Sequence, residues 1–213
     1  MDQDRIVAEA ATIDGDLAAR VGFLLELDRL KTVLRRSRLV DGSRLENTAE
    51  HSWHLAMFAV VLAPYAPEGA DVPRAIEMLL VHDIVEIDAG DTYIYDQAGA
   101  ADKEERENVA ARRLFGLLPD GEGDRLEELW REYEARETPT ARFAYGIDRL
   151  QPSLLNAASG GVSWLEHGIR HSQPVAINQP IVETSPLLWD LARRLFDVAA
   201  DEGLLIDDRA SDR

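Results

Sequence analysis

Leu79-Leu80-Val81-His82-Asp83-Ile84-Val85-Glu86 places an imidazole and two carboxylates inside an otherwise apolar segment. Burying a carboxylate away from water is costly unless a partner or a metal ion compensates its charge. In a helix, Glu86 lies one turn after His82 and Asp83, so it returns to their face. The stretch indicates a metal site, a salt-bridged pair in the core or a solvated stripe, and these residues alone do not decide between the three.

Two further ionisable residues stand in similar surroundings. His51 belongs to Glu46-Asn47-Thr48-Ala49-Glu50-His51-Ser52-Trp53-His54, at the expected start of a helix, and His54 follows one turn later. Asp148 interrupts the apolar run of residues 143–150. Either histidine is a candidate ligand or a hydrogen-bonded core histidine. Asp148 is a candidate ligand or the partner of Arg149 or another arginine.

A rival metal pair lies near the C-terminus. His167 and His171 have the i, i+4 spacing of two ligands on one helix. However, no glutamate follows His167 as it does in the zinc-protease pattern, and Gly168 weakens the helix. The pattern therefore favours the first group of residues over this pair.

The hydrophobic pattern predicts an all-α protein. Apolar residues recur near the helical period, and no stretch alternates at period two over six or more residues, so we expect no sheet. The expected helices cover residues 16–35, 47–62, 71–90, 102–117, 124–136, 138–154, 163–171 and 186–202. Residues 91–99 are expected to form a loop, and 173–186 to be irregular. We expect a single domain over 1–213, a helical bundle of about seven or eight helices with a core at 20–205 and a loose tail at 207–213.

Composition limits the chemistry. The chain has no cysteine, so thiolate-held metal is excluded and any site must use His, Asp and Glu, which suit Mn, Mg, Co, Fe, Ni or Zn. A net charge of −17 repels nucleic acid and anionic membranes, so we expect neither as a partner. A small anionic substrate then needs local compensation of its charge by a metal or arginine.

No apolar run is long enough to span a bilayer and the N-terminus lacks a secretory signal, which predicts a cytoplasmic protein.

The order of a lone His, then His-Asp, then a distant Asp resembles the HD-domain metal-dependent phosphohydrolases. Here the residues are His51, His82-Asp83 and Asp148. The stretches 46–52 and 82–91 resemble the 5′-deoxynucleotidase branch more closely, through Glu86, Gly90 and Asp91. The resemblance covers roughly residues 20 to 205.

That resemblance implies a single HD domain, one divalent metal per subunit, a homodimer and cleavage of nucleoside 5′-monophosphates, often the deoxy forms. It implies that His51, His82, Asp83 and Asp148 are the metal ligands and that Glu86 and Asp91 act on the water and the leaving group. In this branch an arginine followed shortly by a tryptophan contacts substrate. Arg35 is the matching arginine, and the tryptophan is absent from this sequence.

Two candidate substrate contacts and two alternative functions are also predicted. The planar guanidinium of Arg35 suits a phosphate clamp, with a surface arginine as the alternative. Thr92 is a candidate substrate contact, with a turn-stabilising hydroxyl as the alternative. The first alternative function is another HD-type enzyme, a nucleotide pyrophosphohydrolase or phosphodiesterase. The second is a metal-binding helical protein without activity.

Overall fold

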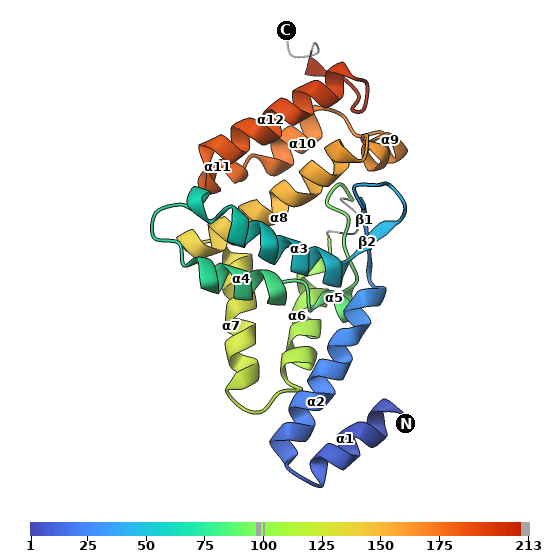
Figure 1. Ribbon diagram of the computed structural model, residues 1–213, viewed down its shortest axis with the longest axis vertical. Helices are drawn as coiled ribbons and strands as arrows, with labels where there is room; N and C mark the ends of the chain where they lie inside the picture. The colour runs from blue at the N-terminus through green and yellow to red at the C-terminus, as the bar shows by residue number, and fades with distance from the viewer. Residues whose placement is uncertain (97–98, 100, 210–213) are drawn as a thin grey trace.

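The computed structural model describes residues 1–96, 99 and 101–209, and the chain is elongated, with α1 at one end and α12 at the other (Figure 1). The all-α prediction is confirmed, with more helices than the seven or eight expected. The helices are α1 Gln3–Ala11, α2 Gly15–Leu27, α3 Thr48–Val61, α4 Val72–Val81, α5 Glu86–Ala89, α6 Lys103–Phe115, α7 Glu122–Ala135, α8 Pro139–Ala158, α9 Val162–His167, α10 Ser172–Asn178, α11 Ile181–Thr184 and α12 Pro186–Asp201, with 3₁₀ turns at Asp28–Thr32 and Ala63–Tyr65.

Several helices begin at the residues whose chemistry predicts a start. The side chain of Asn47 accepts a hydrogen bond from the backbone of Glu50, whose carboxylate accepts one from Asn47 in return, so α3 begins with a capping box. Asp71 caps α4 and Thr138 caps α8, each in front of a proline in the first turn. These caps fix where the helices that carry the candidate site begin.

The prediction of no sheet is wrong at one place. The helix expected to reach Arg35 ends at Leu27, and after a 3₁₀ turn the chain forms β1, Leu34–Arg38, which pairs antiparallel with β2, Leu45–Asn47. The sequence of β1, Leu-Arg-Arg-Ser-Arg, has no apolar alternation that would mark a strand. Its half-buried Arg35 is instead held by carboxylates of the candidate site.

The helix expected over 71–90 is interrupted in its middle. α4 ends at Val81, residues 82–85 form turns with i to i+3 hydrogen bonds, and α5 begins at Glu86. The apolar pattern runs across the break because Ile84, Val85 and Ile87 all reach the core. His82 and Asp83 therefore stand at a helix end.

The other expectations concern the two terminal segments, residues 173–186 and the loop after Gly90. α1 was not expected, and none of its residues is buried. Residues 173–186, expected to be irregular, contain α10 and α11. In the expected tail, Asp208 accepts hydrogen bonds from Ser172 and Arg209 pairs with Asp201, while 210–213 lie outside the described residues. The expected loop is present at 91–96, and residues 97 and 98 also lie outside the described part.

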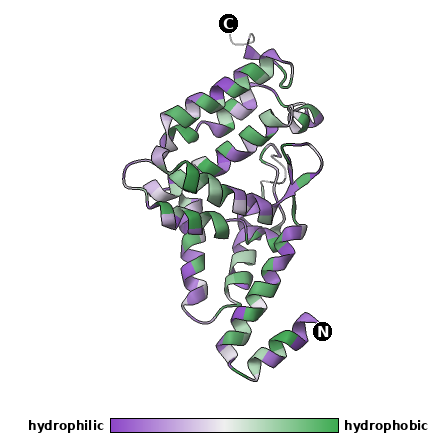
Figure 2. Ribbon diagram, viewed as in Figure 1, coloured by the Kyte–Doolittle hydropathy of each residue, from purple (hydrophilic) through white to green (hydrophobic). Residues whose placement is uncertain are grey.

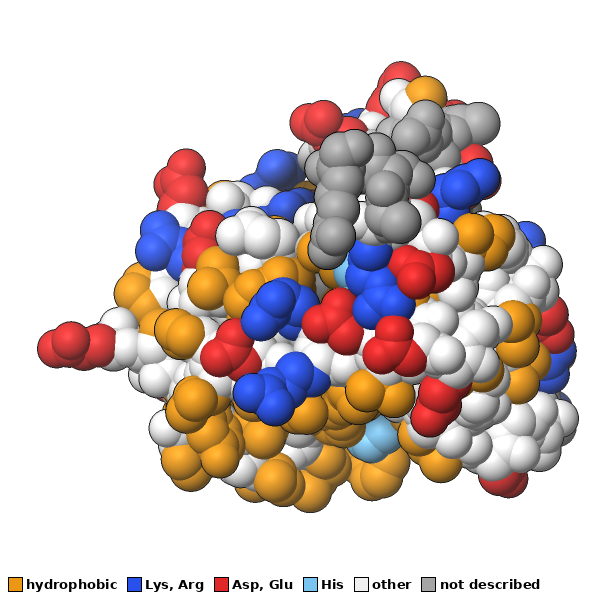
Figure 3. Space-filling view, turned by 90° about the horizontal axis from the view of Figure 1, so that it is seen from above, with side chains coloured by type: hydrophobic (Ala, Val, Ile, Leu, Met, Phe, Trp, Pro, Cys, Tyr) orange, Lys and Arg blue, Asp and Glu red, His pale blue; other side chains and the backbone are white. Residues whose placement is uncertain are grey.

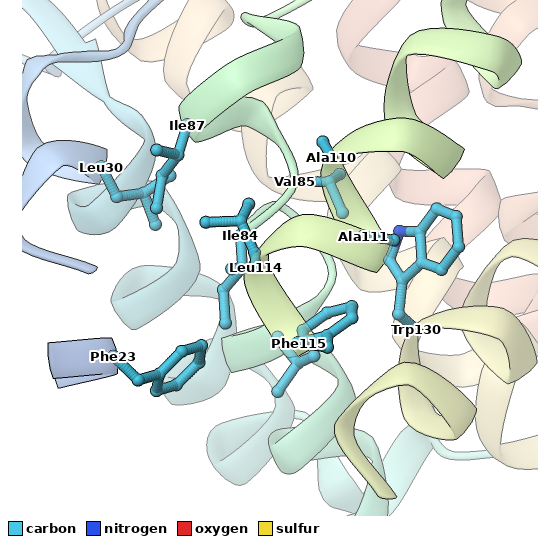
Figure 4. Packing of buried hydrophobic residues seen from close by; sticks show 11 residues of the cluster. Phe23, Leu30, Ile84, Val85, Ile87, Ala110, Ala111, Leu114, Phe115 and Trp130 are labelled. Carbon is cyan, nitrogen blue, oxygen red and sulfur yellow. The ribbon is translucent and has the colours of Figure 1, made fainter. Parts of the chain in front are cut away.

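Three clusters of buried side chains run along the molecule, and the apolar faces of the helices supply them (Figure 2). The first, seen in Figure 4, joins Phe23 of α2, Ile84 and Val85 of the interrupted segment, and Leu114 and Phe115 of α6. α8 contributes to the second and third clusters and packs against α3, α4, α7, α11 and α12. The candidate ligands are anchored by this packing.

The charged surface mixes both signs. In the view along the long axis, acidic and basic side chains lie next to one another in the middle of the face, and hydrophobic side chains gather along its lower edge (Figure 3). Among the described residues, no helix is both long and apolar enough to cross a membrane.

We predict that Gly146→Ala destabilises the fold, because α8 and α11 touch at this glycine. A Cβ at Gly146 would stand 1.9 Å from Oγ1 of Thr184, which is buried and donates to the carbonyl of Arg142. Overpacking of this kind costs about 1–3 kcal/mol of unfolding free energy, measured by denaturant titration. Gly15→Ala is the matched control, since a Cβ there meets nothing within 4 Å. Equal stability of the two variants would contradict the prediction.

Candidate metal centre

The four predicted ligands come from three segments that the fold brings together. His51 lies in the first turn of α3, His82 and Asp83 follow the end of α4, and Asp148 lies in the middle of α8. The two histidines and Asp148 are buried, and Asp83 is partly buried at the edge of a cavity. The structure places these residues where the sequence pattern predicted a common site.

Their nitrogen and oxygen atoms converge on one point. His51 Nε2 lies 3.0 Å from Asp148 Oδ1 and 3.9 Å from Asp83 Oδ2. His82 Nε2 lies 3.1 Å from Asp83 Oδ1 and 3.9 Å from Asp148 Oδ1. Ligand atoms of His51, His82 and Asp83 all lie within 4.8 Å of one another, and Asp148 touches this group through the two histidines.

The donor set fits a divalent cation. His82 Nδ1 lies 3.0 Å from the carbonyl oxygen of Leu79, which fixes the proton on Nδ1 and leaves a lone pair on Nε2. That Nε2 is buried and has no hydrogen-bond partner, although it faces two carboxylates. Burial lowers the pKa of His82, but Asp83 and Asp148 raise it above its ordinary value. A bound divalent cation would accept the lone pair of His82 Nε2 and compensate the negative charges of Asp83 and Asp148.

Asp148 is oriented by two donors on its other oxygen. The Tyr133 hydroxyl donates to Asp148 Oδ2 at 2.9 Å, and Arg149 approaches the same oxygen through Nε at 3.2 Å and Nη2 at 2.5 Å. Oδ1 is thereby left facing the histidines. The ring of Tyr133 also packs on the ring of His82, with centroids 4.8 Å apart. Sequence reasoning missed Tyr133, because it lies on α7 and belongs to no motif.

Glu86 and Asp91 both border the cavity beside the ligands. Glu86 is buried and accepts a hydrogen bond from the Thr48 hydroxyl at 2.9 Å. Burial and the charge of Asp83 hold its pKa well above the ordinary value. Asp91 follows Gly90, whose φ of 74° ends α5 in a conformation that favours glycine. Burial likewise raises the pKa of Asp91, against the opposing effect of Arg35.

The two residues predicted to contact substrate also line this cavity. Arg35 Nη1 lies 3.1 Å from Asp83 Oδ2 and 3.4 Å from Asp91 Oδ1, so its charge is shared between a candidate ligand and a candidate proton-handling residue. Thr92 accepts a hydrogen bond from Arg106 at 3.3 Å, which corresponds to the loop-stabilising alternative. Both remain within reach of a molecule in the cavity, which has a volume of about 260 Å³.

The other histidines lie elsewhere. His54 Nδ1 is 3.2 Å from the amide of Gln151, which also donates to the buried Glu46. Glu46 in turn lies 3.4 Å from His51 Nδ1, a supporting contact that sequence reasoning missed. His167 is bonded to the backbone of α9, and His171 pairs with Asp197 of α12 at 2.9 Å. The two members of the rival pair therefore have separate partners.

Several named proteins are similar in sequence to this chain over part of their length. It is 29% identical over 147 residues to the human protein named 5′-deoxynucleotidase HDDC2, covering 68% of this chain and 71% of that protein. It is 30% identical over 106 residues to the zebrafish protein of the same name, where the match spans 50% of this chain and about half (52%) of the relative. A fission-yeast protein named 5′-deoxynucleotidase hdd1 is 27% identical, over 62% of this chain and 67% of its own length.

Solved structures and a family model point to the same fold. A crystal structure from Magnetospirillum magnetotacticum, described as a predicted metal-dependent phosphohydrolase, is 51% identical and superposes with a TM-score of 0.86 over 89% of this chain and 95% of that chain. A Pyrococcus horikoshii protein at 22% identity shares the fold, with a TM-score of 0.59 over 82% of this chain and 99% of that chain. The model of the HD domain matches residues 27–189. Matching most of the sequence, it shows that this chain belongs to the HD-domain family.

Proposed function

We propose that this protein is a metal-dependent phosphomonoesterase that hydrolyses nucleoside 5′-monophosphates, including the deoxy forms, to nucleoside and phosphate. The observation that carries the proposal is the convergence of His51, His82, Asp83 and Asp148 beside a cavity, with an unpartnered Nε2 on His82. The relatives named 5′-deoxynucleotidase support the choice of substrate. The proposal includes one HD domain and one divalent cation per subunit.

In this proposal the four ligands hold the cation through two neutral imidazoles and two carboxylates. The cation, when bound, polarises the phosphoryl group and lowers the pKa of a coordinated water. Tyr133 and Arg149 keep Asp148 Oδ1 directed at the site by occupying Oδ2. Arg35 provides a positive charge beside Asp83 that a phosphate oxygen can share.

Proton handling is assigned to Glu86 and Asp91, two of the carboxyls that border the cavity without belonging to the ligand set. The leaving 5′-oxygen of the nucleoside must gain a proton, and Glu86 and Asp91 lie on the cavity side of the ligands. General acid–base catalysis by a positioned carboxyl contributes about 10²- to 10⁴-fold to a rate. Thr48 holds Glu86 in place through its hydroxyl.

The substrate assignment predicts phosphate release from nucleoside 5′-monophosphates in the presence of Mn²⁺, Co²⁺ or Mg²⁺. The measurement is inorganic phosphate released from a panel of deoxy- and ribonucleoside mono-, di- and triphosphates, with each metal tested separately. Release of pyrophosphate from triphosphates with inert monophosphates would instead support a pyrophosphohydrolase. Metal binding without any turnover would support a non-catalytic protein.

The division between ligands and proton-handling residues predicts two different variants. Asp83→Ala should lose both metal binding and turnover, since Asp83 touches both histidines. Glu86→Gln should retain the metal but lose about 10²- to 10⁴-fold in kcat. Metal content and phosphate release are measured on the same samples, with the exposed Glu77→Gln as control. Full metal content in Asp83→Ala would contradict the assignment.

The hydrogen bond from Tyr133 to Asp148 predicts that Tyr133→Phe weakens metal binding while the protein stays folded. Loss of a residue that orients a ligand lowers metal affinity by about 10- to 100-fold. The measurement is calorimetric titration of Mn²⁺ into chelator-treated protein, with thermal unfolding recorded in parallel. Tyr65→Phe removes a hydroxyl from an exposed tyrosine and is the matched control. Unchanged Mn²⁺ affinity in Tyr133→Phe would show that Arg149 alone orients Asp148.

A further inference from the structure

The cavity differs in charge from the molecule around it. The protein carries a net charge of −17, yet among the described residues that line the cavity six carboxylates face five basic side chains. With a divalent cation in the candidate centre, the lining becomes positive overall. A cavity of this charge within an acidic protein favours the entry of an anion at short range.

Three of the five basic side chains are already committed to carboxylates. Arg35 pairs with Asp83 and Asp91, Arg149 pairs with Asp148, and Lys103 lies 3.3 Å from Glu107. These pairs mainly hold the carboxylates in place. In the described part of the chain, the other two, Arg36 and Arg136, have no carboxylate within 4 Å.

Of these two, Arg136 is the one whose guanidinium contacts an aromatic ring. It ends α7 with a φ of 55°, the left-handed conformation that L residues other than glycine adopt at a cost. Among the described non-glycine residues it alone has a positive φ. Its guanidinium lies over the ring of Tyr145, with Cζ 4.1 Å from the ring centroid, and Arg149 lies over the same ring at 5.2 Å.

Glycine is the residue that usually ends a helix in this conformation. An arginine at this position has a strained backbone conformation, because its φ is positive. It places a guanidinium without a carboxylate partner on an aromatic ring at the edge of the cavity. Backbone strain of this kind gathers at functional sites. The planar guanidinium, with its donors in a fork, matches the oxygens of a phosphate.

We propose that Arg136, held over Tyr145, is an anion-binding residue that captures the phosphate group of the substrate at the cavity edge. The identity of the anion as a substrate phosphate rests on the proposed phosphomonoesterase activity. The site itself takes any phosphate dianion. Tyr145 supports its guanidinium, and Arg35 remains the arginine that pairs with Asp83.

The test is the affinity of the Mn²⁺-loaded protein for inorganic phosphate, measured by calorimetry at about 0.01 M and about 0.15 M ionic strength. Arg136→Gly should weaken phosphate binding by about tenfold at low ionic strength, since a hydrogen bond to a charged group is lost. The same variant should unfold at a higher temperature, because glycine accepts the backbone conformation. A purely structural arginine would not give this opposition between stability and binding.

Two further variants complete the design. Arg136→Lys keeps the charge but loses the planar fork, so it should recover only part of the phosphate affinity that Arg136→Gly loses at low ionic strength. Arg5→Gln removes an exposed charge from α1, at the far end of the molecule, and should bind phosphate like the wild type (Figure 1). If Arg136→Gly binds phosphate as tightly as Arg5→Gln at both ionic strengths, the proposal is wrong.

The outcome also separates this proposal from the function on which it rests. If the wild type hydrolyses no nucleoside monophosphate but phosphate binding depends on Arg136, the anion site stands and the proposed activity fails. If nucleoside monophosphates are hydrolysed and Arg136→Gly leaves both KM and phosphate affinity unchanged, the activity stands and the anion site fails.

Discussion

The cost of burying Asp148 and Asp83 beside two histidines is the constraint on which the rest of the structure depends. Carboxylates at this depth require compensating charge or hydrogen bonds. Tyr133 and Arg149 supply donors to one oxygen of Asp148, and Arg35 supplies charge to Asp83. Nothing among the described residues satisfies His82 Nε2, which faces both carboxylates. A divalent cation would supply the missing partner of His82 Nε2 and further positive charge for the two carboxylates.

Two features of the fold bring these charged groups together: α4 ends just before His82, and α8 packs against α4. Because α4 ends at Val81, His82 and Asp83 stand at a helix end, where both side chains reach the point that His51 and Asp148 face. α8 supplies Asp148 and is fixed by its packing against both neighbouring cores. The short sheet also contributes, because β1 places Arg35 beside the carboxylates of Asp83 and Asp91.

The sequence predicted the helical class and most helix starts, because caps and apolar periodicity leave local signals, whereas the set of four candidate ligands came from the resemblance to the HD-domain phosphohydrolases. The break at His82 was missed because Ile84 and Val85 continue the apolar pattern across it. β1 was missed because it has no alternating apolar face, and its Arg35 and Arg38 pair instead with carboxylates far away in the sequence. Tyr133 could not be predicted, since its partner Asp148 is close to it only through the packing of α7 against α8.

The proposed function depends above all on a divalent cation held by His51, His82, Asp83 and Asp148. Anomalous diffraction from crystals grown with Mn²⁺ tests it most directly, because it locates the metal without reference to turnover. We expect one strong peak per chain, bonded to Nε2 of both histidines and to both aspartates. Mn²⁺ located elsewhere, with none between these four side chains, would contradict it.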